Sequence, residues 1–193
     1  MVDMARSELI LGGQRSGKSR RAEMLARLWL DAAPDHRAVL IATAQPWDAE
    51  MRDRIARHRQ DRAERVPGML TVEEPLELAQ AITQHSSART LVVVDCLTLW
   101  LTNLLMPPEN SVPNSLPAHD PQAQAAMLLI AIEGGAGPLV LVGNEIGLGV
   151  IPMGQETRVF VDALGRLNQQ VAAACQRVTF MAAGLPLTLK GAA

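Results

Sequence analysis

Eight residues near the N-terminus have the spacing of a phosphate-binding loop. Residues 12–19 read G-G-Q-R-S-G-K-S and directly follow the apolar run 9–11. Glycines let the backbone turn tightly and aim several N–H groups at one anion, and a following helix directs its positive dipole end to the same point. In this motif the lysine reaches the β and γ phosphates, and the next hydroxyl binds Mg²⁺. The pattern predicts a nucleotide site made of Gly12, Gly13, Gln14, Arg15, Ser16, Gly17, Lys18 and Ser19.

A second acidic position, Asp95, closes the apolar run 91–94. In proteins with such a loop, an aspartate at a strand end holds Mg²⁺, usually through water, opposite the loop serine. An aspartate there could instead cap a helix that begins near Leu97, and without the upstream loop this second interpretation would be preferred. With the loop present, we expect Lys18, Ser19 and Asp95 to act together in phosphoryl transfer, with Ser19 and Asp95 as the Mg²⁺ ligands.

Residues 51–62 form a helical pattern rich in arginine, with His58 on the same face as Met51 and Ile55. From this spacing alone, a packed or half-exposed histidine is the simpler interpretation, and the arginines are most simply a solvated face. A neutral imidazole, with a pKa near ~6.5, could also attack the α-phosphate of a triphosphate bound close to these cations. The local residues permit both interpretations.

A third group of polar residues follows the predicted strand 138–144. Residues 144–152 read N-E-I-G-L-G-V-I-P, and the helical pattern after them spaces Arg158, Asp162 and Arg166 four residues apart. Opposite charges at this spacing often form pairs along a helix. The segment would also adjoin the nucleotide end of the sheet, where it could contact a second substrate.

The elements that must position these residues alternate between strands and helices. Aliphatic and β-branched runs predict strands at 8–12, 38–44, 69–73, 90–95, 138–144, 178–182 and 185–190, and helical patterns lie near 17–32, 47–65, 75–86, 97–105, 121–133 and 156–175. Nearly continuous apolar strands are typical of a sheet covered on both faces. We predict one α/β domain over residues 1–193, a P-loop NTPase-like (RecA-like), doubly wound and mostly parallel sheet, with a proline-rich loop at 107–121.

Composition and charge limit the kinds of molecule that this protein is expected to bind. The formal net charge is −2, so no overall basic field favours nucleic acid. No apolar stretch reaches the ~20 residues that span a bilayer, and the N-terminus lacks the pattern of a secretory signal. The two cysteines, Cys96 and Cys175, lie in apolar surroundings, as reduced thiols do. We therefore expect a cytoplasmic protein with small-molecule partners.

The ordered set of motifs resembles the bifunctional adenosylcobinamide kinase and adenosylcobinamide-phosphate guanylyltransferase family of cobalamin biosynthesis. The resemblance runs nearly from end to end. It is carried by residues 12–20 with Ala22 and Glu23, by 41–44, by Glu50, Met51, Arg54, Ile55 and His58, by 95–100 with 102–105, by Asn144, Glu145, Gly147 and Gly149, and by 165–169.

The resemblance implies two reactions on one chain. ATP or GTP would phosphorylate adenosylcobinamide, and GMP would then pass from GTP to adenosylcobinamide-phosphate through a guanylylated histidine, which matches His58. It also implies Mg²⁺ as cofactor and a homo-oligomer, a trimer in which neighbouring subunits help to close the site. Beyond the phosphate loop, the implied GTP contacts are Ala42, Thr43, Ala44, Arg59, Gln60, Asp61, Arg62, Glu73, which adjoins a second glutamate, and Asp95.

Two other functions compete with this interpretation. A single-function P-loop kinase for another small alcohol would need Lys18 and Asp95 but not His58. A nucleotide-dependent switch or binding module would hydrolyse GTP slowly and turn over no corrinoid. The polar segments 144–152 and 158–168 would have no evident role in such a switch.

Overall fold

A computed structural model describes residues 4–106 and 120–191 of the chain. Almost all of the proline-rich loop predicted at 107–121 lies outside these residues, so its expected conformation stays a prediction. Among the described residues, no helix combines the length and the apolar character that crossing a bilayer requires.

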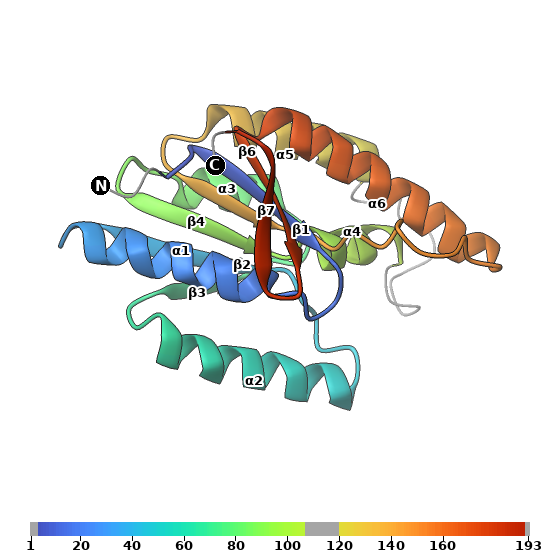
Figure 1. Cartoon of the computed structure of the whole chain (residues 1–193), viewed down its shortest axis with the longest axis horizontal. Coiled ribbons are helices and arrows are strands. Elements are labelled where there is room, and N and C mark those ends of the chain that lie inside the picture. The colour runs from blue at the N-terminus through green and yellow to red at the C-terminus, as the bar shows by residue number, and fades with distance from the viewer. Residues whose placement is uncertain (1–3, 107–119, 192–193) are drawn as a thin grey trace.

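The described chain contains thirteen elements, and seven of them are strands of one sheet (Figure 1). Strands and helices alternate except where α5 follows α4 and β7 follows β6. The sheet order is β3-β2-β4-β5-β1-β6-β7, and all neighbouring strands are parallel except β6 and β7. The strands are β1 (Ser7–Gly12), β2 (Arg37–Ala42), β3 (Leu70–Glu73), β4 (Thr90–Asp95), β5 (Leu139–Val142), β6 (Arg177–Ala182) and β7 (Leu185–Lys190). The helices are α1 (Lys18–Ala32), α2 (Ala49–Arg65), α3 (Leu78–His85), α4 (Leu97–Leu105), α5 (Pro121–Gly134) and α6 (Gln155–Ala174).

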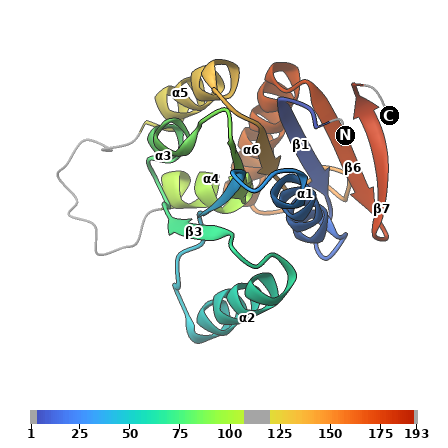
Figure 2. The same cartoon turned by 90° about the vertical axis from the view of Figure 1, so that its left-hand side faces the viewer.

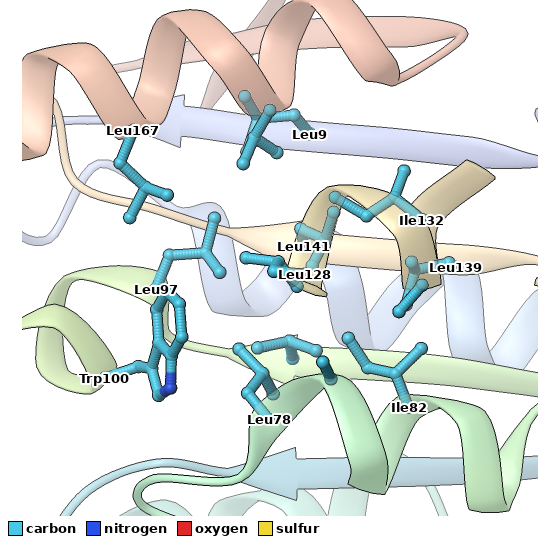
Figure 3. Packing of buried hydrophobic residues seen from close by; sticks show 14 of the residues in the cluster. Leu9, Leu78, Ile82, Leu97, Trp100, Leu128, Ile132, Leu139, Leu141 and Leu167 are labelled. Atoms are coloured by element: carbon cyan, nitrogen blue, oxygen red, sulfur yellow. The ribbon is translucent and has the colours of Figure 1, made fainter. Parts of the chain in front are cut away.

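Helices cover both faces of the sheet, as the apolar strands predict. Helices α3, α4, α5 and α6 pack on one face, where Leu9, Leu141 and Trp100 belong to the larger of two buried clusters (Figure 3). Helix α1 covers the other face, and α2 lies beyond it, on the same side of the sheet (Figure 2). Successive residues of β1 alternate between the two clusters, as the two-residue period of a strand requires. The predicted α/β fold is therefore confirmed.

The strand order brings three chain segments to one edge of the sheet. Val142, the last residue of β5, pairs with Ile10 of β1 on one side and with Asp95 of β4 on the other. Carboxyl ends of parallel strands share an edge, so the phosphate loop after β1, Asp95 and the segment after β5 lie next to one another. The expected functional residues gather where this fold usually binds its ligands.

Two predicted strands end earlier than the sequence pattern indicates. The strand predicted to reach residue 44 ends at Ala42, and the one predicted to reach 144 ends at Val142. Beyond β5 the backbone still bonds to β1, since the N–H groups of Gly143 and Glu145 donate to the carbonyls of Ile10 and Gly12, while the Asn144 N–H between them donates to the Thr98 hydroxyl at 2.8 Å. The Thr43 N–H likewise donates to the Asp95 carbonyl at 3.3 Å. Both segments thus stay joined to their neighbours at the edge where the site lies.

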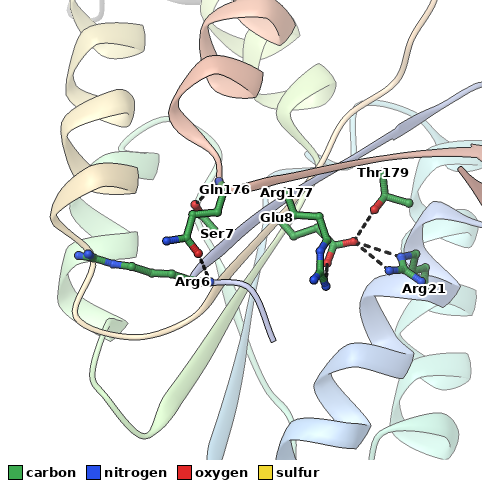
Figure 4. Close-up of polar contacts among 7 residues, drawn as sticks. All are labelled: Arg6, Ser7, Glu8, Arg21, Gln176, Arg177 and Thr179. Carbon is green, nitrogen blue, oxygen red and sulfur yellow. Dashed lines mark hydrogen bonds and ion pairs between the residues drawn. The ribbon is translucent and has the colours of Figure 1, made fainter. Parts of the chain in front are cut away.

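A buried charge network fixes α1 against the N-terminal half of β1, the half away from the phosphate loop (Figure 4). Glu8 is only 2% exposed, and its carboxylate accepts hydrogen bonds from Arg21 of α1 and from the Thr179 hydroxyl of β6, at 2.8 Å in the latter case. The Arg177 guanidinium lies 3.9 Å from the second carboxylate oxygen. Because α1 begins with Lys18, this network also sets the direction in which the phosphate loop enters its helix.

Candidate active site

The loop between β1 and α1 has the backbone that its glycines predict. Gly12 and Gly17 have φ angles of 151° and 102°, which side chains rarely allow. A Cβ atom on Gly12 would lie 2.5 Å from the Met181 carbonyl oxygen. The turn between β6 and β7 also holds the loop, because the Gly184 N–H donates to the Ser16 carbonyl at 3.0 Å. The loop is therefore closely supported from behind, while Gln14 and Arg15 are exposed.

The surroundings of Lys18 favour the binding of an anion. Its side chain is buried and its Nζ donates to the Gly13 carbonyl at 2.7 Å. Burial lowers the pKa of Lys18, while the nearby Cys96 and Asp95 raise it and Arg54 lowers it further. Among the described residues, the buried Ser16 hydroxyl has no hydrogen-bond partner. Phosphate oxygens would satisfy that hydroxyl and restore the pKa of the lysine.

Thr43 and Asp95 meet at the ends of β2 and β4. Thr43 is completely buried, and its hydroxyl donates to the Cys96 carbonyl at 2.7 Å and accepts from the Cys96 N–H at 2.9 Å. The Asn103 amide donates to the Thr43 carbonyl at 2.8 Å. The Thr43 side chain thus holds the turn after Asp95, and the half-buried Ala42 and Ala44 flank it.

The chemistry of Ser19 and Asp95 suits Mg²⁺, which prefers oxygen ligands and keeps several waters. Ser19 follows Lys18 at the start of α1. Asp95 is the last residue of β4, and one strand, β5, lies between β4 and β1. The described part of the chain contains no group of three or more His, Cys, Asp or Glu side chains that could hold a metal by themselves. Two oxygen ligands from the protein would leave the other positions around a Mg²⁺ ion to the nucleotide and water.

Helix α2 is fixed at its start by a cap and near its end by ion pairs. The Asp48 carboxylate accepts the Met51 N–H at 2.7 Å. Arg65 pairs with the buried Glu23 of α1 at 3.0 Å, and Arg59 pairs with Glu73 at the end of β3. These contacts join α2 both to the helix that follows the phosphate loop and to the sheet.

One face of α2 is turned toward the phosphate loop. Arg62 is buried, which lowers its pKa, and the charges of Asp95 and Glu23 act to raise it. Arg54 is close enough to Lys18 to lower the pKa of that lysine. Since residues four apart on a helix share a face, His58 lies between Arg54 and Arg62.

The His58 side chain is itself exposed, although Met51 and Ile55 on its face are half-buried and Arg62 is buried. The simpler expectation from spacing was a packed or half-exposed histidine, and the exposure of His58 contradicts only its packed form. His58 is open to a ligand on the side of α2 where the charge of Arg54 acts on Lys18 and the charge of Asp95 acts on Arg62.

Two other residues of α2 that were predicted to contact GTP, Gln60 and Asp61, bond within the helix. Gln60 is exposed and donates to Glu64 at 3.4 Å, and Asp61 pairs with Arg65 at 3.1 Å. These partners lie within the helix, so the structure does not bring Gln60 to the phosphate loop. Arg54 does lie there, although it was not among the predicted contacts. Its spacing of four from His58 is the signal that would have indicated it.

The segment after β5 directly contacts the phosphate loop. The Glu145 N–H donates to the Gly12 carbonyl at 3.1 Å, and the Asn168 side chain of α6 donates to the Asn144 carbonyl at 3.1 Å. Arg158 donates to the Pro152 carbonyl at 3.0 Å, so it holds the loop rather than a charged neighbour along α6. The segment after β5, which was predicted to contact a second substrate, is therefore hydrogen-bonded to the phosphate loop.

Comparison with known proteins assigns this arrangement to a family. The family model described as cobinamide kinase / cobinamide phosphate guanyltransferase matches residues 8–189. The chain belongs to this family. It is 46% identical to the bifunctional adenosylcobalamin biosynthesis protein CobP of Pseudomonas aeruginosa, over 95% of this chain and 97% of that protein. It is also 35% identical to CobU of Escherichia coli, described as a bifunctional adenosylcobalamin biosynthesis protein, over 94% of this chain and 98% of that one.

A solved structure outside the family shares the fold. The flagellar accessory protein FlaH of Methanocaldococcus jannaschii superposes with a TM-score of 0.51, covering 97% of this chain and 79% of that chain at 9% sequence identity. At this identity the likeness concerns the fold alone. The shared fold does not indicate the reaction, which depends on the residues at the carboxyl ends of the strands.

Proposed function

We propose that this chain phosphorylates the hydroxyl of adenosylcobinamide with ATP or GTP and then transfers GMP from GTP onto the new phosphate, forming adenosylcobinamide-GDP. Membership of the family and the identity to relatives described as bifunctional support both steps. The observation that carries the proposal is the position of His58, exposed on α2 between Arg54, whose charge acts on Lys18, and Arg62, on which the charge of Asp95 acts.

In the kinase step, the phosphate loop and Lys18 hold the β and γ phosphates of the nucleotide. Mg²⁺ bound between Ser19 and Asp95 would offset charge on the phosphate oxygens when the nucleotide is present. The contribution of the chain is position and charge, because Lys18 is held by the Gly13 carbonyl at 2.7 Å and enters the site with its pKa lowered by burial.

In the guanylyl step, an imidazole nitrogen of His58 attacks the α-phosphorus of GTP. The phosphorus–nitrogen bond forms as the bond to the bridging oxygen breaks, and pyrophosphate leaves with the electron pair. A phosphate oxygen of adenosylcobinamide-phosphate then attacks the same phosphorus and releases the imidazole. Arg54 and Arg62 offset the negative charge that develops on the phosphate oxygens, and Arg59, held by Glu73, borders the same face.

Labelling with GTP tests this assignment. Incubation with α-labelled GTP should leave acid-labile label on the wild-type chain, and His58→Ala should take up none while it still phosphorylates adenosylcobinamide from γ-labelled ATP. His85→Ala, at the end of α3, is the matched control and should label normally. Label that persists in His58→Ala would refute the intermediate.

The same experiment separates the competing functions. A single-function kinase would phosphorylate its acceptor without taking up label from α-labelled GTP. A nucleotide-dependent switch would release phosphate slowly from GTP and form no corrinoid product. A coupled assay with adenosylcobinamide, ATP and GTP should yield adenosylcobinamide-GDP if the proposal is right.

We also propose a homotrimer in the cytoplasm. Three leucines of the edge strand β7, Leu185, Leu187 and Leu189, are 57–70% exposed, which suits a surface covered by another subunit. Cys96 and Cys175 are free and buried, as suits a reducing compartment. Light scattering coupled to size-exclusion chromatography should give three times the chain mass of 20.8 kDa, and a monomer mass would reject the trimer.

A further inference from the structure

A large cavity lies on the side of the phosphate loop away from α2. Its volume is about 1020 Å³, and its walls are the segment after β5, helix α6 and the end of β7. Leu11, which directly precedes the phosphate loop, also lines it. The cavity is therefore continuous with the nucleotide edge of the sheet, but it takes no part in the steps described for α2.

Glu145 stands where this cavity meets the phosphate loop. Its N–H donates to the Gly12 carbonyl at 3.1 Å, while Lys18 donates to the carbonyl of the next residue, Gly13. One carboxylate oxygen accepts the Gly147 N–H at 2.8 Å, and the other lies 3.5 Å from the Asn168 amide. The carboxylate is thus held in place by an amide of its own loop, and it lines the cavity beside the loop that binds phosphate.

We propose that the cavity binds adenosylcobinamide and that Glu145 is the general base of the kinase step, an inference that rests on the proposed function. The Glu145 carboxylate takes the proton of the aminopropanol hydroxyl as its oxygen bonds to the γ-phosphorus. The bond between that phosphorus and the β–γ bridging oxygen breaks, and ADP leaves with the electron pair. Glu145 then returns the proton to water.

The walls of the cavity suit the acceptor. A corrinoid presents methyl groups on a broad ring and amides around its rim. Leu148, Val150 and Ile151 of the segment after β5 are 77–96% exposed in the free protein, and a ring face would cover them. On the opposite wall, Asp162 and Arg166 of α6 offer polar partners for the amides. The volume is at the upper end of the usual range for ligand sites, ≈ 300–1,000 Å³.

The substitution Glu145→Gln tests the base and keeps the shape of the side chain. Loss of a general base lowers a rate by about 10²–10⁴-fold. We expect kcat of the kinase step to fall by this factor, the KM for adenosylcobinamide to stay within about twofold, and labelling of His58 by GTP to be unchanged. Glu156→Gln, an exposed change in the first turn of α6, should leave both reactions intact.

A kinase step of Glu145→Gln at the wild-type rate would overturn the assignment of the base. An equal loss of kinase activity and of labelling would also overturn it, because it would make Glu145 a purely structural residue. If the wild-type protein phosphorylates no corrinoid at all, the proposed function fails instead, and the two failures are therefore distinguishable.

The substitution Gly165→Leu tests the cavity. Gly165 lies on α6 and lines the cavity, and a Cβ atom there would meet no heavy atom within 4 Å. The leucine should fill space that the corrinoid needs, raising the KM for adenosylcobinamide about tenfold or more without changing labelling by GTP. Gly134→Leu on α5, which also has open space at Cβ, is the matched control.

Gly149→Leu repeats the test from the loop wall, where a Cβ atom also has open space. Melting temperatures of all three variants should lie close to that of the wild type. An unchanged KM for adenosylcobinamide in both cavity variants would place the corrinoid elsewhere and overturn the proposal.

Discussion

Two roles are possible for the Thr43 hydroxyl, contact with GTP or support of the turn after Asp95. Replacing the hydroxyl distinguishes between them. The resemblance to the family implies that Thr43 contacts GTP, whereas the structure engages its hydroxyl in two hydrogen bonds with Cys96. Thr43→Val keeps the volume and removes both bonds. If the hydroxyl mainly holds the turn after Asp95, the variant should lose stability but keep its affinity for GTP.

The expected loss follows from the groups left behind. The Cys96 N–H would lose its partner in a region where Thr43 is 0% exposed, whereas the Cys96 carbonyl would still accept the Trp100 N–H at 3.2 Å. An unpaired buried N–H costs about 1–3 kcal/mol. We expect the free energy of unfolding to fall by about 1–3 kcal/mol, which lowers Tm by about 2–12 °C for a chain of this size.

Urea denaturation of the apo protein gives the free energy of unfolding, and calorimetric titration gives the GTP affinity of the folded protein. Thr71→Val, an exposed change on β3, is the matched control and should stay within about 0.5 kcal/mol of the wild type. A Thr43→Val protein of full stability with GTP affinity reduced about tenfold would refute this reasoning, because the hydroxyl would then contact the nucleotide.

Glu8→Gln should destabilise the protein by about 3 kcal/mol in urea denaturation, because it removes the charge of a buried carboxylate that pairs with the half-buried Arg21 and Arg177, whereas Asp31→Asn at an exposed helix pair should have no measurable effect. Burial raises the pKa of the Cys96 thiol to about 11 and that of Cys175 to about 12. Both thiols hold their protons more tightly when folded, so the free energy of unfolding should decline as the pH rises above about 9, and a pH-independent value up to 10.5 would contradict this. Gly17→Ala should weaken GTP binding in titration calorimetry and lower Tm, because its φ is 102° and a Cβ would lie 3.2 Å from the Gly184 Cα; unchanged binding would show that the loop adapts.

Local patterns were sufficient to predict most elements of this fold. The strand at 90–95 and the helix at 97–105 have the predicted bounds, because the first is a nearly continuous apolar run and the second a helical pattern of mostly apolar residues, although Asp95 does not cap that helix. The phosphate loop was predictable because its glycines meet a backbone requirement, which the positive φ of Gly17 illustrates. Such signals depend on neighbours in the sequence.

What the sequence could not predict depends on neighbours in space. The sequence predicted that segment 144–152 adjoins the nucleotide end of the sheet, but no local pattern states that β5 lies between β1 and β4, so the bond of Glu145 to Gly12 could not be derived. The inward direction of Thr43 depends on Cys96 and Asn103, which are more than fifty residues away. The exposure of His58 depends on how α2 meets the sheet, and periodicity alone could not decide between a packed and a half-exposed side chain.

The interposed strand β5 also bears on how the proposed magnesium ion would enter and leave the site. Neighbouring strands lie about 4.8 Å apart, so β1 and β4 are separated by roughly 10 Å. A triphosphate held by the loop after β1 would carry its chelated metal across the end of β5 toward Asp95. With this proposed ligand set, the metal would arrive with the nucleotide and depart with the diphosphate or pyrophosphate.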